Sequence, residues 1–393
     1  MSSRHRRREH VLAICLAVCL AACDSGSGRD GASVESATAS SSPGSDVVAF
    51  PTAEFAAITE GPVSPEAAAT LQAVVREMAG RGGMAVTVMT AAGTWSGAVG
   101  KADGVRDVRT DDQFAIGSVT KPLIAAQVMQ LVEAGRLELD DPASDHLPAD
   151  LDFDTNGATI RQLLGMRSGI PDYVDAIWAS LSTDRRRTWG PGELLRLVPD
   201  DRSPTGGEPQ YSSTNYLLLG LIIERVAGRP VAEVLREGVL DHEGLDRLVY
   251  QPAEVPTEPM AMPGGEPRSA FTKGGGLLPS FAGATAAGPA GGMVSDSGSL
   301  ARWWRSFCAG QVVSLASVSE MATLDRGYGL GLYGVAGPDE RSVGHAGEQV
   351  GYVAWAGCLP AYRGVIVVLS NRVVEDIGAI ARPFVAAVAS GLG

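Results

Sequence analysis

Apolar and polar residues follow two patterns along the chain, one typical of strands and one typical of helices. The strand-like pattern occurs toward the two ends of the chain. Residues 84–90 and 94–99 are typical of paired strands around a glycine-containing turn. Further short apolar or aromatic runs, punctuated by glycine, occur at 328–333, 352–356 and 365–369. From residue 140 to about 285 the pattern predicts helices and loops without a sheet. We therefore expect a sheet built from both ends of the chain, with a helical insertion.

Helices are expected where apolar residues recur every three or four positions. Ser64 and Pro65 favour a helix that runs to Gly80, and a second is predicted from Ser118 to about Gly135. Three more are predicted at residues 158–166, 215–227 and 377–389. The pattern thus predicts a sheet lobe (51–110 and 286–393), a helical lobe (111–285) and a binding site where the lobes meet.

The first 50 residues have a different composition. Residues 1–22 carry four arginines and an apolar run too short to span a bilayer, which is typical of an export signal. Leu20-Ala21-Ala22-Cys23 resembles a bacterial lipobox, which implies cleavage before Cys23 and lipid attachment to its thiol. A plain or twin-arginine signal is the alternative. Residues 23–50, rich in Ser, Gly and Ala, predict a flexible tether. We expect an exported protein, lipid-anchored to the outer face of the bacterial cell membrane, with residues 51–393 folded.

Charge and metal-binding residue types narrow the function further. The net charge is −13, and residues 1–22 contribute +3, which leaves −13 − 3 = −16 for the remainder. An acidic chain without a basic stripe argues against nucleic acid as a partner. The histidines after the signal lack metal-ligand spacing, so we expect no metal and no cofactor. Cys308 and Cys358 form either a disulfide or two buried free thiols.

The segment from Phe114 to Pro122 holds the candidate chemistry. Ser118 and Lys121 are three residues apart, so on a helix the amine can reach the hydroxyl. Only three of the 32 basic residues are lysines, and arginine cannot give up its proton. We interpret Lys121 as a base whose pKa falls through burial by about three units from about 10.4. The alternative is a capping serine followed by a solvated lysine.

Two more segments hold candidate residues. Tyr211-Ser212-Ser213 precedes an apolar helix, so it is either a helix cap or a site where Tyr211 relays protons. His345, in Gly344-His345-Ala346-Gly347, stands at a strand-like edge, where an ordinary hydrogen-bonded histidine is the alternative.

Together, Ser-x-x-Lys at 118–121, Tyr-Ser-Ser at 211–213 and His-Ala-Gly at 345–347 resemble the three motifs of the serine β-lactamase and penicillin-binding family. The likeness covers about residues 60–390 and is nearest to D-alanyl-D-alanine carboxypeptidases and class C β-lactamases. It implies an α/β (α+β), β-lactamase/transpeptidase-like fold, with an antiparallel sheet flanked by helices and a mostly helical lobe.

The resemblance also implies roles for single residues. Ser118 is the nucleophile, Lys121 its base and Tyr211 a general acid/base, while His345 takes a place usually held by lysine or histidine. The backbone N–H groups of Ser118 and Glu348 form the oxyanion hole. The implied substrate-binding residues are Ser213, His345, Ala346, Gly347 and Glu348.

Several positions depart from the family pattern. The second motif usually ends in asparagine, and here it ends in Ser213. Where carboxypeptidases grip a terminal carboxylate with arginine and threonines, this chain has Tyr333, Ala346 and Glu348. These departures argue against strict trimming of D-alanyl-D-alanine.

We expect a serine hydrolase that forms a covalent acyl-enzyme with an amide or ester, such as a cell-wall peptide, a β-lactam or a related small acyl compound. An esterase or D-amino-acid amidase on the same scaffold is the alternative. A catalytically inactive, penicillin-binding-like envelope protein is the alternative of another class.

Overall fold

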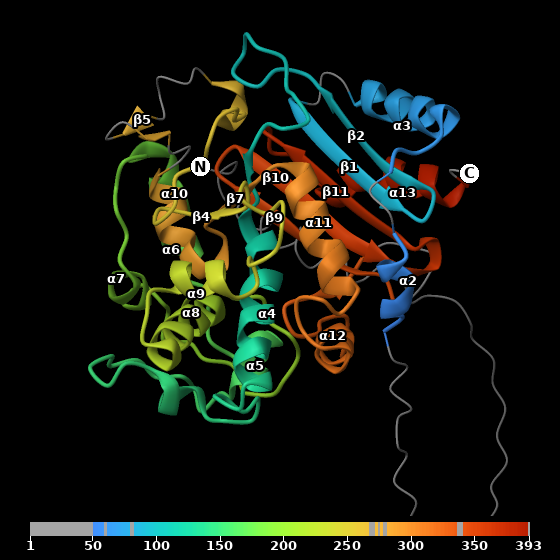
Figure 1. Ribbon diagram of the computed structural model, residues 1–393. Coiled ribbons are helices and arrows are strands. Elements are labelled where there is room, and N and C mark those ends of the chain that lie inside the picture. The colour runs from blue at the N-terminus through green and yellow to red at the C-terminus, as the bar shows by residue number, and fades with distance from the viewer. Residues whose placement is uncertain are drawn as a thin grey trace, which may run out of the picture. The chain divides into compact units, whose positions relative to one another are not determined.

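The computed structural model describes residues 50–58, 61–78, 82–266, 272–273, 276–277, 281–335 and 341–391 (Figure 1). The predicted export signal, lipobox cysteine Cys23 and most of the tether lie outside the described residues. Residues from Phe50 onward form one compact unit.

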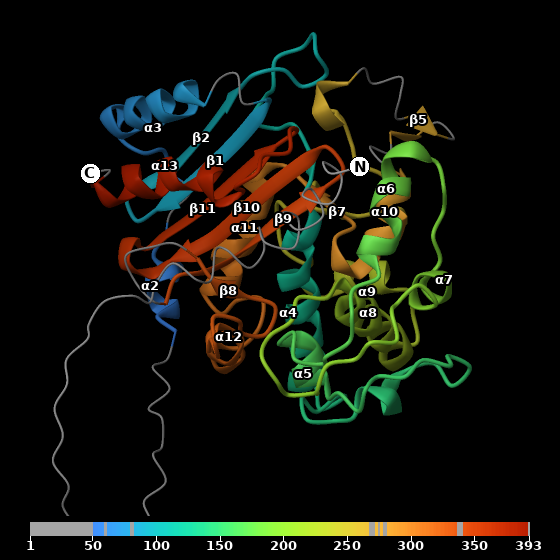
Figure 2. The ribbon, with the colours of Figure 1, turned by 180° about the vertical axis from the view of Figure 1, so that it is seen from behind.

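The main sheet has six antiparallel strands in the order β2-β1-β11-β10-β9-β8 (Figure 2). Their bounds are β1 Met84–Thr90, β2 Gly93–Val99, β8 Tyr333–Gly334, β9 Val343–Gln349, β10 Tyr352–Leu359 and β11 Gly364–Ser370. Two strands come from the start of the folded chain and four from its end, so the sheet is built from both ends as predicted, although only three late strands were expected.

Helices cover both faces of this sheet. α11 (Ser297–Cys308) crosses one face, while α3 (Pro65–Glu77) and α13 (Gly378–Ala389) cover the other (Figures 1 and 2). Successive residues of a strand point to opposite faces, so Ala85 and Val86 belong to two separate apolar clusters. Because both faces are covered, β1, β10 and β11 are buried along their whole length.

Two small sheets lie outside the main one. β3 (Phe114–Ala115), β7 (Met293–Ser295) and β4 (Val249–Tyr250) form the first, and β5 (Thr272–Lys273) pairs with β6 (Gly276–Leu277) in the second. β4, β5 and β6 fall in the region predicted to contain no sheet, so that prediction is wrong in detail. Two-residue strands are too short to show an alternating pattern.

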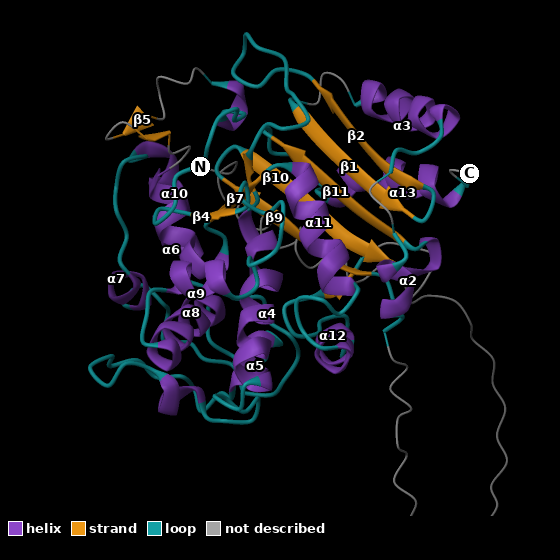
Figure 3. Ribbon diagram, in the orientation of Figure 1, coloured by secondary structure: helices purple, strands orange, loops and turns teal. Residues whose placement is uncertain are grey.

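The remaining helices form most of the body beside the sheet (Figure 3). They are α2 Thr52–Ala56, α4 Thr120–Glu133, α5 Ile160–Leu164, α6 Val174–Thr183, α7 Pro191–Leu195, α8 Ser213–Ala227, α9 Val231–Glu237, α10 Phe281–Ala287 and α12 Leu315–Ala322. Every helix expected from the sequence is present, although the predicted end at Gly80 lies outside the described residues. No helix within the described ranges combines the length and apolar character needed to cross a bilayer.

The strand predicted at residues 328–333 is a second correction. Only Tyr333–Gly334 is a strand. Gly331, inside the predicted strand, adopts a φ angle of +78°, a left-handed conformation that an extended strand does not contain.

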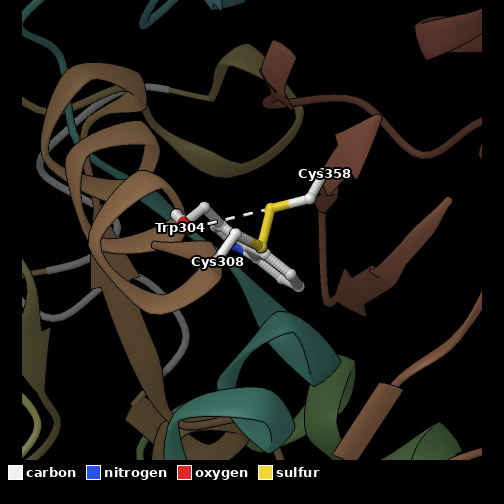
Figure 4. Close-up of a disulfide and its surroundings, with 3 residues drawn as sticks. All are labelled: Trp304, Cys308 and Cys358. Atoms are coloured by element: carbon white, nitrogen blue, oxygen red, sulfur yellow. Dashed lines mark hydrogen bonds between the residues drawn. A yellow bond between two sulfur atoms is a disulfide. The ribbon is translucent and has the colours of Figure 1, made fainter. Parts of the chain in front are cut away.

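Cys308 and Cys358 are joined by a disulfide, which resolves the two alternatives left by the sequence (Figure 4). The bond ties the end of α11 to β10, so it links a covering helix directly to the main sheet. Cys358 Sγ lies 3.7 Å from the carbonyl oxygen of Trp304, in contact with the last turns of α11.

Candidate active site

Ser118 lies in a short 3₁₀ turn, Gly117–Val119, that leads directly into α4. The helix predicted to begin at Ser118 therefore begins at Thr120, with Pro122 in its first turn, where the missing N–H has no intrahelical acceptor to serve. The Ser118 side chain is partly exposed. The turn thus presents a reachable hydroxyl at the entrance to a buried helix.

Lys121 is fully buried, and its amine faces Ser118. Nζ lies 3.0 Å from Ser118 Oγ and donates to the Ala290 carbonyl oxygen at 2.7 Å. The rings of Tyr211 and Tyr216 lie 4.8 and 5.5 Å from Nζ. The amine reaches the hydroxyl as the spacing predicted, and this is not the environment of a solvated lysine.

A segment distant in sequence holds the start of α4 in place. The Ile116 N–H donates to the Met293 carbonyl at 3.0 Å, and the Met293 N–H donates to Thr120 Oγ1 at 3.2 Å. Ala290, which accepts from Lys121, precedes Met293 by three residues. β7 and the turn before it therefore fix both the Ser118 turn and the Lys121 amine.

The Tyr-Ser-Ser segment is positioned by Asp172. The Ser213 N–H donates to Asp172 Oδ2 at 2.9 Å, and Asp172 Oδ1 accepts from the Val174 N–H at 3.0 Å. One carboxylate thus caps the first turns of α8 and α6 together. Burial raises the pKa of Asp172, while these two N–H donors and the charge of Lys121 act in the opposite direction.

His345 is buried, and its neighbours define its protonation. Burial and the charge of Lys121 lower the pKa of His345 to about 3, so its imidazole is neutral. Nδ1 lies 2.6 Å from the Ala346 carbonyl oxygen, which only accepts, so Nδ1 carries the proton. Nε2 is then an acceptor, and it lies 3.4 Å from the Tyr328 hydroxyl.

Aromatic rings surround this imidazole. The ring centroids of Tyr333, Tyr211 and Tyr328 lie 4.8, 6.2 and 6.5 Å from that of His345. The Tyr333 hydroxyl also accepts a hydrogen bond from the Ala346 N–H. The Tyr211 ring therefore neighbours both Lys121 and His345.

The third motif packs against the Ser118 turn, backbone to backbone. A Cβ placed on Gly347 would lie 2.0 Å from the Ile116 carbonyl oxygen and 3.0 Å from the Ser118 nitrogen. A Cβ on Gly117 would lie 2.5–2.7 Å from the backbone atoms of Glu348. Glycine is required at both positions, and the close approach brings the N–H groups of Ser118 and Glu348 to the same region.

The structure adds residues to which the sequence reasoning assigned no role. Asp172 and Tyr328 lie within residues 60–390, where the sequence resembles the family, but outside its three motifs, so only that broad likeness pointed to them. The Ala290 carbonyl had no signal, since any residue supplies a carbonyl oxygen. In the described part of the chain, no group of three or more His, Cys, Asp or Glu side chains is arranged to hold a metal ion.

An antiparallel sheet between helical layers, with a Ser–Lys pair beside it, gives this protein the β-lactamase/transpeptidase-like fold of serine hydrolases. The model of the Beta-lactamase family matches residues 71–390, and the chain belongs to that family.

Named relatives and solved structures agree with this assignment. The chain is similar to Penicillin-binding protein 4* of Bacillus subtilis (strain 168), with 29% identity over 145 residues, 36% of this chain and 31% of that protein. It is 35% identical over 168 residues to Penicillin-binding protein 4 of Amycolatopsis lactamdurans, over 40% of this chain and 41% of that protein. The matched segments thus span less than half the length of these relatives.

Among solved structures, a D-stereospecific amidohydrolase from Streptomyces sp. superposes with a TM-score of 0.64 and 25% identity, over 79% of this chain and 95% of that one. A D-amino acid amidase from Ochrobactrum anthropi SV3 superposes with a TM-score of 0.68, over 83% of this chain and 99% of that one. Its identity is 21%, so this second likeness shows the fold alone.

Proposed function

We propose that this chain hydrolyses an amide or ester through a covalent acyl-enzyme on Ser118. The observation that carries the proposal is the buried Lys121 amine, 3.0 Å from Ser118 Oγ. A serine hydroxyl is a weak nucleophile, so it needs an adjacent base, and Lys121 would take its proton as Oγ attacks the carbonyl carbon. The Ser118 and Glu348 N–H groups would stabilise the oxyanion, and Tyr211 would protonate the leaving group.

The neutral His345 would assist this chemistry without carrying charge. Its Nε2 accepts from the Tyr328 hydroxyl, so the imidazole holds the Tyr328 ring in place, and His345 itself packs beside Tyr211. Ser213, in the first turn of α8, and the backbone of β9 from Ala346 to Glu348 would bind the substrate. Water would then attack the acyl-enzyme, with the same groups returning the proton to Ser118.

For the substrate we propose a small acyl compound, either a cell-wall peptide or β-lactam, or an amide or ester without a terminal carboxylate. Relatives named as penicillin-binding proteins support the first class. The likeness to the D-stereospecific amidohydrolase supports a D-amino-acid amidase or esterase, as does the absence of a cationic residue at Tyr333, Ala346 and Glu348.

We further propose that the protein is exported and held at the outer face of the cell membrane by lipid on Cys23. The sequence Leu20-Ala21-Ala22-Cys23 supports this proposal. The Cys308–Cys358 disulfide supports export as well, because disulfides persist in oxidising compartments.

The test is covalent labelling. Residues from 51 onward, purified, are incubated with a fluorescent penicillin and with an activated ester, and compared with Ser118→Ala. We expect label or ester turnover that the substitution abolishes. No reaction with either probe in both proteins would instead favour the catalytically inactive envelope protein.

A further inference from the structure

Glu348 is a half-buried carboxylate at the third motif. Side chains alternate along β9, so Ala346 and Glu348 share one face, while His345 points to the other, toward Lys121. In β10, Val353 pairs with Glu348 and is completely buried. The Glu348 side chain therefore leaves the sheet beside apolar surface rather than in open solvent.

The carboxylate of Glu348 has no compensating cation among the residues that the structure describes. Burial raises its pKa, and no neighbouring charge or hydrogen bond acts in the opposite direction. Ion pairs elsewhere in the described chain join arginines to other carboxylates. A partly desolvated carboxylate is unfavourable unless a cation or hydrogen-bond donor approaches it.

The location of Glu348 means that such a cation can come with the substrate. The Glu348 backbone packs against Gly117, the residue before the nucleophile. An acyl compound held at Ser118 thus lies beside the backbone of Glu348, from which the carboxylate extends. The Tyr333 hydroxyl, on the neighbouring strand, accepts from the Ala346 N–H and supplies no positive charge there.

We propose that Glu348 is a specificity-determining residue that selects substrates carrying an ammonium group close to the scissile amide or ester. The same carboxylate repels substrates with a carboxylate at that place. The inference rests on the proposed function, because it requires the substrate to be held at Ser118. It narrows the substrate to cationic amides and esters.

Binding measured in the Ser118→Ala protein separates this inference from the proposed catalysis. Two series of amides are titrated at about pH 7, where carboxylates are ionised and most α-amino groups are still protonated. The acyl-side series is D-alanine anilide with its amine free, acetylated or succinylated. The leaving-group series is N-(2-aminoethyl)benzamide, N-propylbenzamide and N-benzoyl-β-alanine. We expect the cation to bind roughly ten- to hundredfold more tightly than the anion in one series.

Adding Glu348→Gln to the Ser118→Ala protein should remove most of this preference, and Glu348→Lys should reverse it. The matched control is Glu138→Gln, the same loss of charge at an exposed position beyond the far end of α4, about 20 Å away along the helix. It should leave the preference unchanged.

The outcomes are distinct. Equal binding of cation and anion in both series, or a preference that survives Glu348→Gln in a folded protein, would overturn the inference. A cation preference that depends on Glu348 supports it, even if wild-type protein hydrolyses neither series and takes no label. That last result would refute the proposed catalysis alone.

Discussion

At the scale of single residues, Lys121 shows how burial prepares a side chain for chemistry. A lysine removed from water is costly unless its amine is hydrogen-bonded, and here Ser118 and Ala290 lie within hydrogen-bonding distance. The stem of the side chain is enclosed, so the amine has little freedom to leave Ser118. The same contacts that satisfy the amine therefore also orient it toward the hydroxyl.

Lys121→Met tests the role of the amine while keeping a flexible side chain of similar length. Without a base, we expect kcat/KM for an activated ester to fall by about 10²- to 10⁴-fold. Stability should change little, because an apolar side chain suits a buried site. The control is Lys101→Met, the same change at an exposed lysine paired with Asp107. Activity within threefold of wild type in Lys121→Met would contradict the role.

His345 predicts a pH dependence of stability. Its pKa is about 3 in the folded protein and about 6.5 in an unfolded chain. Above about pH 6.5 both states hold a neutral imidazole, so it contributes nothing. Below that, the unfolded state binds a proton that the folded state does not, so stability is lost as the pH falls.

Urea unfolding at about pH 7.5, 6 and 5 measures this effect. From pH 7.5 to pH 5, the free energy of unfolding of wild type should fall by about 2 kcal/mol more than that of His345→Gln, which cannot titrate. The comparison between proteins cancels the contributions of the other titrating groups. Parallel curves for the two proteins would show that His345 is not held neutral.

At the scale of elements, the contact between β9 and the Ser118 turn depends on glycine. Gly117 has a φ of +51°, and a Cβ there would collide with the Glu348 backbone. Gly117→Ala should therefore move β9 away from Ser118 and abolish most activity, with a stability loss beyond the roughly 1–2 kcal/mol of left-handed strain.

Gly135→Ala is the matched control for this prediction. Gly135 follows α4 with a φ of +67°, but no atom lies within 4 Å of its added Cβ. It carries the strain without the collision, so we expect a similar strain cost with activity retained. Thermal unfolding and labelling of both variants give the comparison. Equal activity in the two would mean that the close approach of β9 is not needed.

The elements predicted correctly from the sequence are those with a long apolar pattern or with a strong capping signal at their ends. β1 and β11 are largely continuous apolar runs, α3 and α8 are long enough to show a helical period, and α3 also has its capping serine. α11 was not predicted, although it covers a face of the main sheet. Its first turn, Ser297-Gly298-Ser299, contains weak helix formers, and Asp296 offsets this by accepting from the Ser299 N–H.

In the candidate site too, some contacts could be predicted from the sequence and others could not. Ser118 and Lys121 are close in sequence, so helical spacing alone predicted their contact. The contacts of Lys121 with Ala290, of Ser213 with Asp172 and of His345 with Tyr328 join different elements. Such contacts depend on tertiary packing, which a period along the chain does not encode.

At the scale of the whole molecule, the sheet draws its strands from both ends of the described unit, and the disulfide adds a covalent link to that arrangement. Cys308 and Cys358 are 50 residues apart, and the segment between them includes α12, β8 and β9. Closing a loop of this length reduces the entropy of the unfolded chain by an amount worth about 4 kcal/mol. The link therefore restrains the segment that carries His345 and Glu348.

Removing the disulfide should lower stability while leaving the site intact. We expect Cys308→Ala/Cys358→Ala to lower the Tm by roughly 5 °C, and reductant to lower the wild-type Tm by a similar amount. Reductant should not affect the double variant, which controls for other actions of the reagent. Labelling of Ser118 well below the Tm should persist, because the folded protein retains the contacts of Lys121. If reductant left the wild-type Tm unchanged although free thiols were detected, the disulfide would not stabilise the fold.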